Sequence, residues 1–119
     1  MEKELKGKVA IVTGAGRLRG IGRAAAVALA RLGADVVVTG TGRSPDSFPD
    51  DEKKIGWRDI ESVSEQIRNE GQKALPLISN VTSQEDVQKM VDDTMNEFGR
   101  IDILINNAAY AQLKIESQY

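Results

Sequence analysis

The sequence contains no cysteine and no histidine. Without cysteine there is no disulfide, no thiolate nucleophile and no thiolate metal ligand. Without histidine there is neither an imidazole base nor the commonest ligand of zinc. These two absences exclude catalytic triads of the Ser-His-Asp kind and ordinary zinc sites, and we expect no metal centre.

An excess of one charge and long apolar runs are also missing. The 119 residues carry 16 Lys and Arg against 18 Asp and Glu, a formal net charge of −2. This balance gives no global attraction to nucleic acid or to an anionic membrane, so we expect neither as a partner. No run approaches the roughly 18 apolar residues of a membrane span, and Met1 to Lys8 lacks the apolar stretch of a signal peptide. We therefore expect a cytoplasmic protein.

Short apolar runs rich in β-branched residues predict buried strands. The clearest are Val9 to Thr13, Val36 to Thr39 and Ile101 to Ile105. A weaker strand, Ala74 to Ser79, contains Pro76, which has no N–H to donate to a neighbouring strand. We therefore expect this weaker strand at an edge of the sheet.

Three segments between these strands have apolar residues at helical spacing. They are Ile21 to Leu32, about Asp59 to Glu70, and Ser83 to Phe98. A glycine follows each of them, where a left-handed residue commonly ends a helix. The Ser83 hydroxyl is expected to accept a backbone N–H at the start of the third helix.

The alternation of strands and helices predicts an α/β fold with a parallel sheet and helices on both faces. In the Rossmann-like, doubly wound arrangement the third predicted strand lies outermost, next to the second, and the first and fourth follow. This order places Pro76 in an edge strand, where a residue without an N–H group is tolerated. We expect residues 1–119 to form one partial domain, truncated after the fourth strand. Residues 40–58, polar and with two prolines, are expected to be a long inserted loop.

A glycine-rich turn follows the first predicted strand and leads into a helix. Glycines let the backbone approach a phosphate closely, and the start of a helix offers unpaired N–H groups and a positive dipole. The turn lacks the Lys-Ser/Thr pair of a Walker A loop, since Arg23 and Ala24 follow it. The alternative is a flexible turn whose glycines only allow tight packing. The candidate phosphate-binding residues are Gly14, Gly16, Gly20, Ile21 and Gly22.

A second motif, Asn106-Asn107-Ala108-Ala109, follows the fourth predicted strand. With Thr13-Gly14 and Gly20-Ile21-Gly22 it gives a pattern that resembles the short-chain dehydrogenase/reductase family, from about residue 6 to residue 109. Compared with that family, the glycine-rich turn is longer by two residues, Asn80 replaces an aspartate and Ala109 replaces a glycine.

The resemblance implies a nicotinamide dinucleotide as cofactor. It implies that Asn107, Ala108 and Ala109 line the ribose and nicotinamide side of this cofactor. It also implies that Asn80 and Val81 flank the adenine, with the Asn80 amide still offering an acceptor.

The residue at the end of the second predicted strand bears on the choice of cofactor. An acidic side chain there binds the adenosine ribose and repels a 2′-phosphate, but Gly40 stands at this position. Polar and basic residues that could surround a phosphate are Thr39, Thr41, Arg43 and Arg19. We therefore expect NADP(H) to be favoured over NAD(H), unless the two arginines are ordinary solvated residues.

The family's catalytic groups are a Tyr, a Lys four residues later, and a Ser. Tyr110 and Lys114 have this spacing but follow the second motif directly, whereas the family's pair lies well beyond it. We therefore expect no catalytic residue in this chain.

The leading hypothesis is the cofactor-binding portion of an oxidoreductase that acts, in full-length form, on a small alcohol or carbonyl substrate. The alternatives are a non-catalytic dinucleotide-binding or regulatory module and a purely structural fragment. The exposed apolar edge of the strand Ile101 to Ile105 further predicts self-association or pairing with a complementary C-terminal half.

Overall fold

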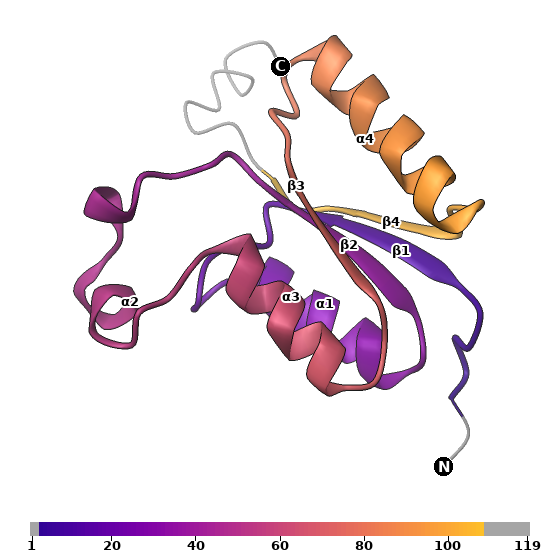
Figure 1. The fold of residues 1–119 in the computed structure, drawn as a ribbon, viewed down its shortest axis with the longest axis horizontal. Coiled ribbons are helices and arrows are strands. Elements are labelled where there is room, and N and C mark those ends of the chain that lie inside the picture. The colour runs from indigo at the N-terminus through magenta and orange to yellow at the C-terminus, as the bar shows by residue number, and fades with distance from the viewer. Residues whose placement is uncertain (1–2, 109–119) are drawn as a thin grey trace, which may run out of the picture.

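The computed structural model describes residues 3–108, which form a parallel sheet with helices on both faces (Figure 1). The sheet has four strands in the order β3-β2-β1-β4, and each neighbouring pair is parallel. The α/β class, the Rossmann-like arrangement and the strand order predicted from the sequence are confirmed. The strands are β1 (Val9–Thr13), β2 (Asp35–Gly40), β3 (Ala74–Ile78) and β4 (Ile103–Asn106).

The helices lie in two layers, with α1 and α3 on one face of the sheet and α4 on the other (Figure 1). Side chains alternate between the two faces of a strand, so each layer has its own core. Val36 and Val38 pack with residues of α1 and α3, whereas Val37 packs with Met90 of α4. The helices are α1 (Ile21–Arg31), α2 (Asp50–Lys54), α3 (Ile60–Asn69) and α4 (Gln84–Phe98), and a 3-10 helix, η1, covers Pro45–Ser47.

The predicted start and stop signals act as expected. The Ser83 hydroxyl accepts the Asp86 N–H over 3.2 Å at the start of α4, and Gly99 ends this helix with a φ of 77°. Pro76 lies in β3, at the outer edge of the sheet, opposite Val38 of β2. Ser83 and Gly99 therefore set where α4 begins and ends. Pro76 lies in an edge strand, where its missing N–H costs the sheet no hydrogen bond between inner strands.

The region expected to be an inserted loop differs from the prediction because it contains η1 and α2. Pro45 is the first residue of η1, and Pro49 immediately precedes α2, positions that suit a residue with fixed φ and no N–H. The acidic run 50–52 occupies the first turn of α2 and two lysines its last turn, which complements the helix dipole. Residues 41–58 are named the inserted segment below.

Asp102 connects the start of β4 to the start of β1. Its carboxylate accepts the Val9 N–H over 2.8 Å and two N–H groups of Arg100, each over 2.8 Å. The hydrogen bond from Arg100, helped by that from Val9, holds the pKa of Asp102 below its ordinary value. The β4 strand accordingly begins at Ile103, two residues later than predicted.

No helix within residues 3–108 has the length and apolar character needed to cross a bilayer.

We predict that Asp102→Asn lowers the melting temperature at neutral pH. Because the folded-state pKa is depressed, the carboxylate stabilises the fold above the pKa of the unfolded chain, and this contribution disappears as the pH falls through the folded-state value. The melting temperatures of the two proteins should therefore differ by a constant amount from pH 7 to about pH 4 and converge only on further acidification. A difference that persists unchanged well below about pH 4, measured by circular dichroism, would contradict the assignment.

Candidate functional site

The loops that follow the four strands meet at the carboxyl end of the sheet and enclose two adjoining hollows. The hollows measure about 310 and 350 Å³, and both are lined by Gly14, Thr41 and Ala108. Together they are named the carboxyl-end cleft. In open parallel sheets of this kind, ligands bind outside the carboxyl ends of the strands. The other predicted site residues that line the cleft are Gly16, Gly20, Gly40, Arg43, Asn80, Val81 and Asn107.

Three predicted residues do not line the cleft within the described chain. Gly22 packs behind the glycine-rich loop, Ile21 is exposed at the start of α1, and Arg19 pairs with Asp51. Ala109 and the Tyr110 and Lys114 pair lie outside the described residues.

The glycine-rich loop is held against the end of β4 by direct contacts between backbones. Gly14 has a φ of 64°, and a Cβ on it would lie 2.8 Å from the Ala108 Cα. The Asn107 side chain donates to the Gly14 carbonyl over 3.0 Å, and the Ala108 N–H donates to the Thr13 hydroxyl over 3.1 Å. The two motifs recognised in the sequence are therefore hydrogen-bonded to each other.

The start of α1 is open to an anion. Gly20 precedes the helix and offers no side-chain cap, and the first turn contains no acidic residue. The first N–H groups of a helix need an outside partner, and the helix dipole makes this end positive. With the closely approaching glycines beside it, this end of α1 suits a phosphate group.

Asn80 lies in a tight turn after β3. Its side-chain oxygen accepts the Thr82 N–H over 3.0 Å and the Thr82 hydroxyl over 2.7 Å, which accounts for both lone pairs of an amide oxygen. The Asn80 N–H donates to Asp86 over 2.8 Å. The expected acceptor for an adenine amine is thus already engaged, and Asn80 contributes a rigid wall to the cleft.

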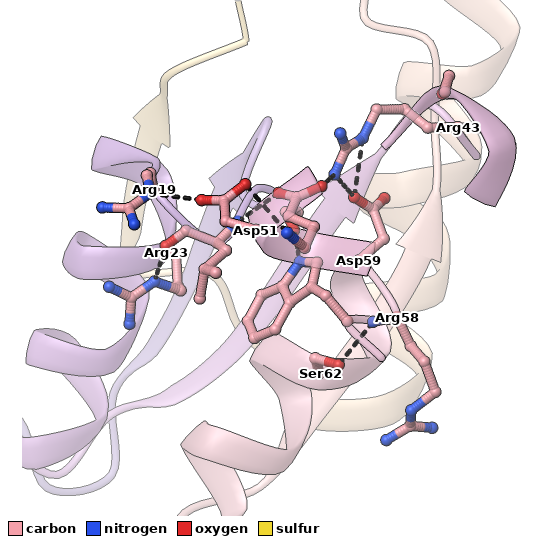
Figure 2. A network of polar contacts seen from close by, with 12 residues as sticks. Arg19, Arg23, Arg43, Asp51, Arg58, Asp59 and Ser62 are labelled. Carbon is pink, nitrogen blue, oxygen red and sulfur yellow. Dashed lines mark hydrogen bonds and ion pairs between the residues drawn. The ribbon is translucent and has the colours of Figure 1, made fainter. Parts of the chain in front are cut away.

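The inserted segment holds the lengthened glycine-rich loop in place (Figure 2). The indole N–H of Trp57 donates to the Gly16 carbonyl over 2.7 Å, in a buried position. The Leu18 N–H donates to the Glu52 carboxylate over 2.8 Å. These bonds supply partners for backbone groups inside the loop, and nothing in the spacing of the sequence signals them.

Arg43 forms a buried cluster with two carboxylates (Figure 2). Glu52 belongs to the inserted segment, and Asp59 follows this segment directly. The Arg43 Nε and Nη2 lie 3.0 and 2.5 Å from the Asp59 Oδ1, and the same Nη2 lies 3.1 Å from Glu52 Oε1. The Arg43 guanidinium also stacks 4.4 Å from the centre of the Phe48 ring. The three charged residues are named the Arg43 cluster, and their formal charges sum to −1.

This arrangement corrects the expectation that Arg19 and Arg43 are available to surround a phosphate. Arg43 is bound by Glu52 and Asp59, and Arg19 is bound by Asp51. Glu52 belongs to the acidic run 50–52, and runs of this kind are usually solvated, but the residue is 1% exposed. Its partners, Leu18 and Arg43, are distant in the sequence, so no local sequence pattern predicts the burial of Glu52.

A larger hollow of about 510 Å³ lies beneath the inserted segment, next to the edge strand β3. Apolar side chains, including Trp57, Ile60 and Ile78, form much of its lining, and Arg43 separates it from the cleft. Across residues 3–108, no three Asp or Glu side chains gather closely enough to hold a metal ion.

Comparison with known proteins gives consistent matches. A family model described as short chain dehydrogenase matches residues 8–118. A 12alpha-hydroxysteroid dehydrogenase from a Clostridium species is 42% identical over 106 residues, which are 86% of this chain and 36% of that protein.

Solved structures give the same result. A short chain dehydrogenase from Mycobacterium thermoresistibile matches with a TM-score of 0.75 and 30% identity, over 92% of this chain and 36% of that one. The carveol dehydrogenase of Mycobacterium avium, in complex with NAD, matches with a TM-score of 0.72 and 27% identity. The match covers 90% of this chain and 37% of that one. The chain thus spans little more than a third of the length of these proteins.

We predict that Gly22→Ala destabilises the protein, whereas Gly20→Ala is tolerated. A Cβ on Gly22 would lie 2.7 Å from the Gly14 oxygen and 2.8 Å from the Asn107 side-chain nitrogen, so the loop must shift. Overpacking of this kind costs about 1–3 kcal/mol of unfolding free energy. A Cβ on Gly20 meets nothing closer than 3.4 Å, and its expected cost is below about 1 kcal/mol. Equal midpoints in urea for the two variants would contradict this packing.

Proposed function

The chain belongs to the short-chain dehydrogenase family, and on this premise we propose that it forms the nicotinamide dinucleotide-binding part of an oxidoreductase. The proposed reaction of the whole protein is hydride transfer between this cofactor and a small alcohol or carbonyl substrate. The observation that carries the proposal is the hydrogen-bonded contact between the glycine-rich loop and the Asn107-Ala108 motif at the carboxyl-end cleft.

The residues of the cleft fit a dinucleotide. The start of α1 and the closely packed Gly14 suit the pyrophosphate, because both present backbone N–H groups without side chains in the way. Asn80 and Val81 would flank the adenine, and Asn107 and Ala108 the nicotinamide-side ribose. The bound cofactor would supply or accept the hydride. This chain's own residues bind and orient it, and none of residues 3–108 is assigned a catalytic role.

The choice between NAD(H) and NADP(H) depends on the end of β2. Gly40 leaves this position without a carboxylate, which favours NADP(H) on sequence grounds alone. The two arginines that would read a 2′-phosphate, Arg19 and Arg43, are engaged by carboxylates, and this removes the basis for that preference. The carveol dehydrogenase neighbour is described with NAD, which supports the wider class of nicotinamide dinucleotides. The cytoplasmic location stays a prediction.

Calorimetric titration with NADH and NADPH tests the proposed binding. We expect saturable binding of at least one of them, because the loop and the helix start offer preformed partners for the pyrophosphate. Adenosine, which lacks the pyrophosphate, serves as the control and should bind at least about tenfold more weakly. Saturable binding without alcohol oxidation would favour the non-catalytic dinucleotide-binding module, and absence of binding of both dinucleotides would favour the structural fragment.

We further propose that β4 takes part in association with a second copy of the chain. Within residues 3–108 this strand pairs only with β1, and the Leu104 side chain is 60% exposed. An open strand edge with apolar side chains readily pairs with another chain.

Light scattering at micromolar concentration should therefore give a mass of two or more chains. Leu104→Lys should reduce this mass, because a charged side chain opposes pairing at a strand edge. The control is Ile55→Lys, a change at a residue that is 61% exposed in the inserted segment, and it should leave the mass unchanged. A monodisperse monomer in the unmodified protein would contradict the association.

A further inference from the structure

Asp59 combines a rare backbone conformation with a buried carboxylate. It is the one residue other than glycine with a positive φ, 58°, in the described part of the chain. It directly precedes α3 and is 8% exposed. Such a conformation is strained for a residue other than glycine, so the surrounding contacts hold Asp59 in place.

The two carboxylate oxygens of Asp59 have different surroundings. Both N–H groups from Arg43 go to Oδ1. Oδ2 receives no hydrogen bond from any residue between 3 and 108. Oδ2 is not among the fully buried side-chain atoms that lack a partner, so a donor group of a ligand can reach it.

The position of Oδ2 indicates which ligand group this is. A Cβ built on Gly40 would lie 3.0 Å from Asp59 Oδ2, and one built on Gly16 would lie 2.6 Å from the same atom. Both glycines line the carboxyl-end cleft, Gly40 at the end of β2 and Gly16 in the glycine-rich loop. Asp59 itself lines the larger hollow beneath the inserted segment, and its carboxylate fills the space beside the cleft that a side chain on Gly40 would otherwise occupy.

We propose that Asp59 reads the adenosine ribose and makes the protein prefer NAD(H) over NADP(H). This inference rests on the proposed dinucleotide binding. In dinucleotide folds an acidic residue at the end of the second strand accepts a ribose hydroxyl. Here Asp59 supplies this acceptor from the start of α3 through Oδ2. The same carboxylate opposes a 2′-phosphate by like-charge repulsion.

Arg43 acts as a positioning residue in this arrangement. Its guanidinium holds Oδ1 and is itself shared with Glu52, so one positive charge faces two carboxylates. The opposing possibility is that Arg43 Nη1, buried and without a partner among the described residues, takes a 2′-phosphate. That would place a third anionic group beside the two buried carboxylates, which the net negative charge of the cluster disfavours.

The test compares NADH and NADPH affinities by calorimetry for the unmodified protein and for Asp59→Asn. We expect the unmodified protein to bind NADH at least about tenfold more tightly than NADPH. A hydrogen bond to a charged group is worth about 1.5 kcal/mol or more, so Asp59→Asn should raise the Kd for NADH about tenfold and reduce the preference by a similar factor. The same comparison with 5′-AMP and 2′,5′-ADP isolates the adenosine half.

Two further variants keep the test decisive. Asp59→Gly also removes the carboxylate and suits the positive φ, so it should fold and show the same loss of preference. Glu61→Gln removes an equal charge from an exposed residue of α3 and should leave the preference unchanged. Thermal melting confirms that each variant is folded.

Each result has a distinct meaning. A preference of the unmodified protein for NADPH, or an unchanged preference in folded Asp59→Asn and Asp59→Gly, overturns the role of Asp59 while leaving dinucleotide binding intact. A lack of binding of both dinucleotides overturns the proposed function and the inference with it.

Discussion

The close approach of two backbones, at Gly14 and Ala108, is the constraint on which the cleft depends. The β1 and β4 strands are neighbours in the sheet, so the loops that leave them at the carboxyl end must pass within van der Waals contact. A side chain on Gly14 would fill the gap. With no side chain there, the Asn107 amide and the Ala108 N–H can hydrogen-bond to the preceding loop and fix its path. The order of the strands in the sheet therefore brings the two loops of the site together.

A second layer of constraint comes from buried charge. Glu52, Asp59 and Arg43 are taken out of water together, which is unfavourable unless each charge finds good partners. The guanidinium pairs with both acids, the Phe48 ring stacks on it, and the Leu18 N–H donates to Glu52, while Arg43 Nη1 and Glu52 Oε1 have no hydrogen-bond partner among the described residues. Separating these ion pairs would leave a buried charge without a partner. The cluster therefore favours one arrangement of the inserted segment over the alternatives.

The sequence predicts well those features that depend on neighbouring residues. The strand order follows from alternation and from Pro76, and the ends of α4 follow from Ser83 and Gly99. It predicts poorly those that depend on distant partners. The sequence favours Arg43 and Arg19 as phosphate ligands because their carboxylate partners, Asp59 and Asp51, lie 16 and 32 residues away. It predicts a loop in place of α2 because a five-residue helix leaves too short a periodic pattern.

The hydrogen bonds of Trp57 and Glu52 with the glycine-rich loop make two separate stretches of chain a single structural unit. The two additional residues of the loop expose backbone groups that only the inserted segment satisfies. A chimera that transplants the long loop into a relative without residues 41–58 would leave these groups without partners, and the reverse exchange would leave an indole and a carboxylate without theirs. The glycine-rich loop and the inserted segment should accordingly be exchanged as a pair when the protein is engineered.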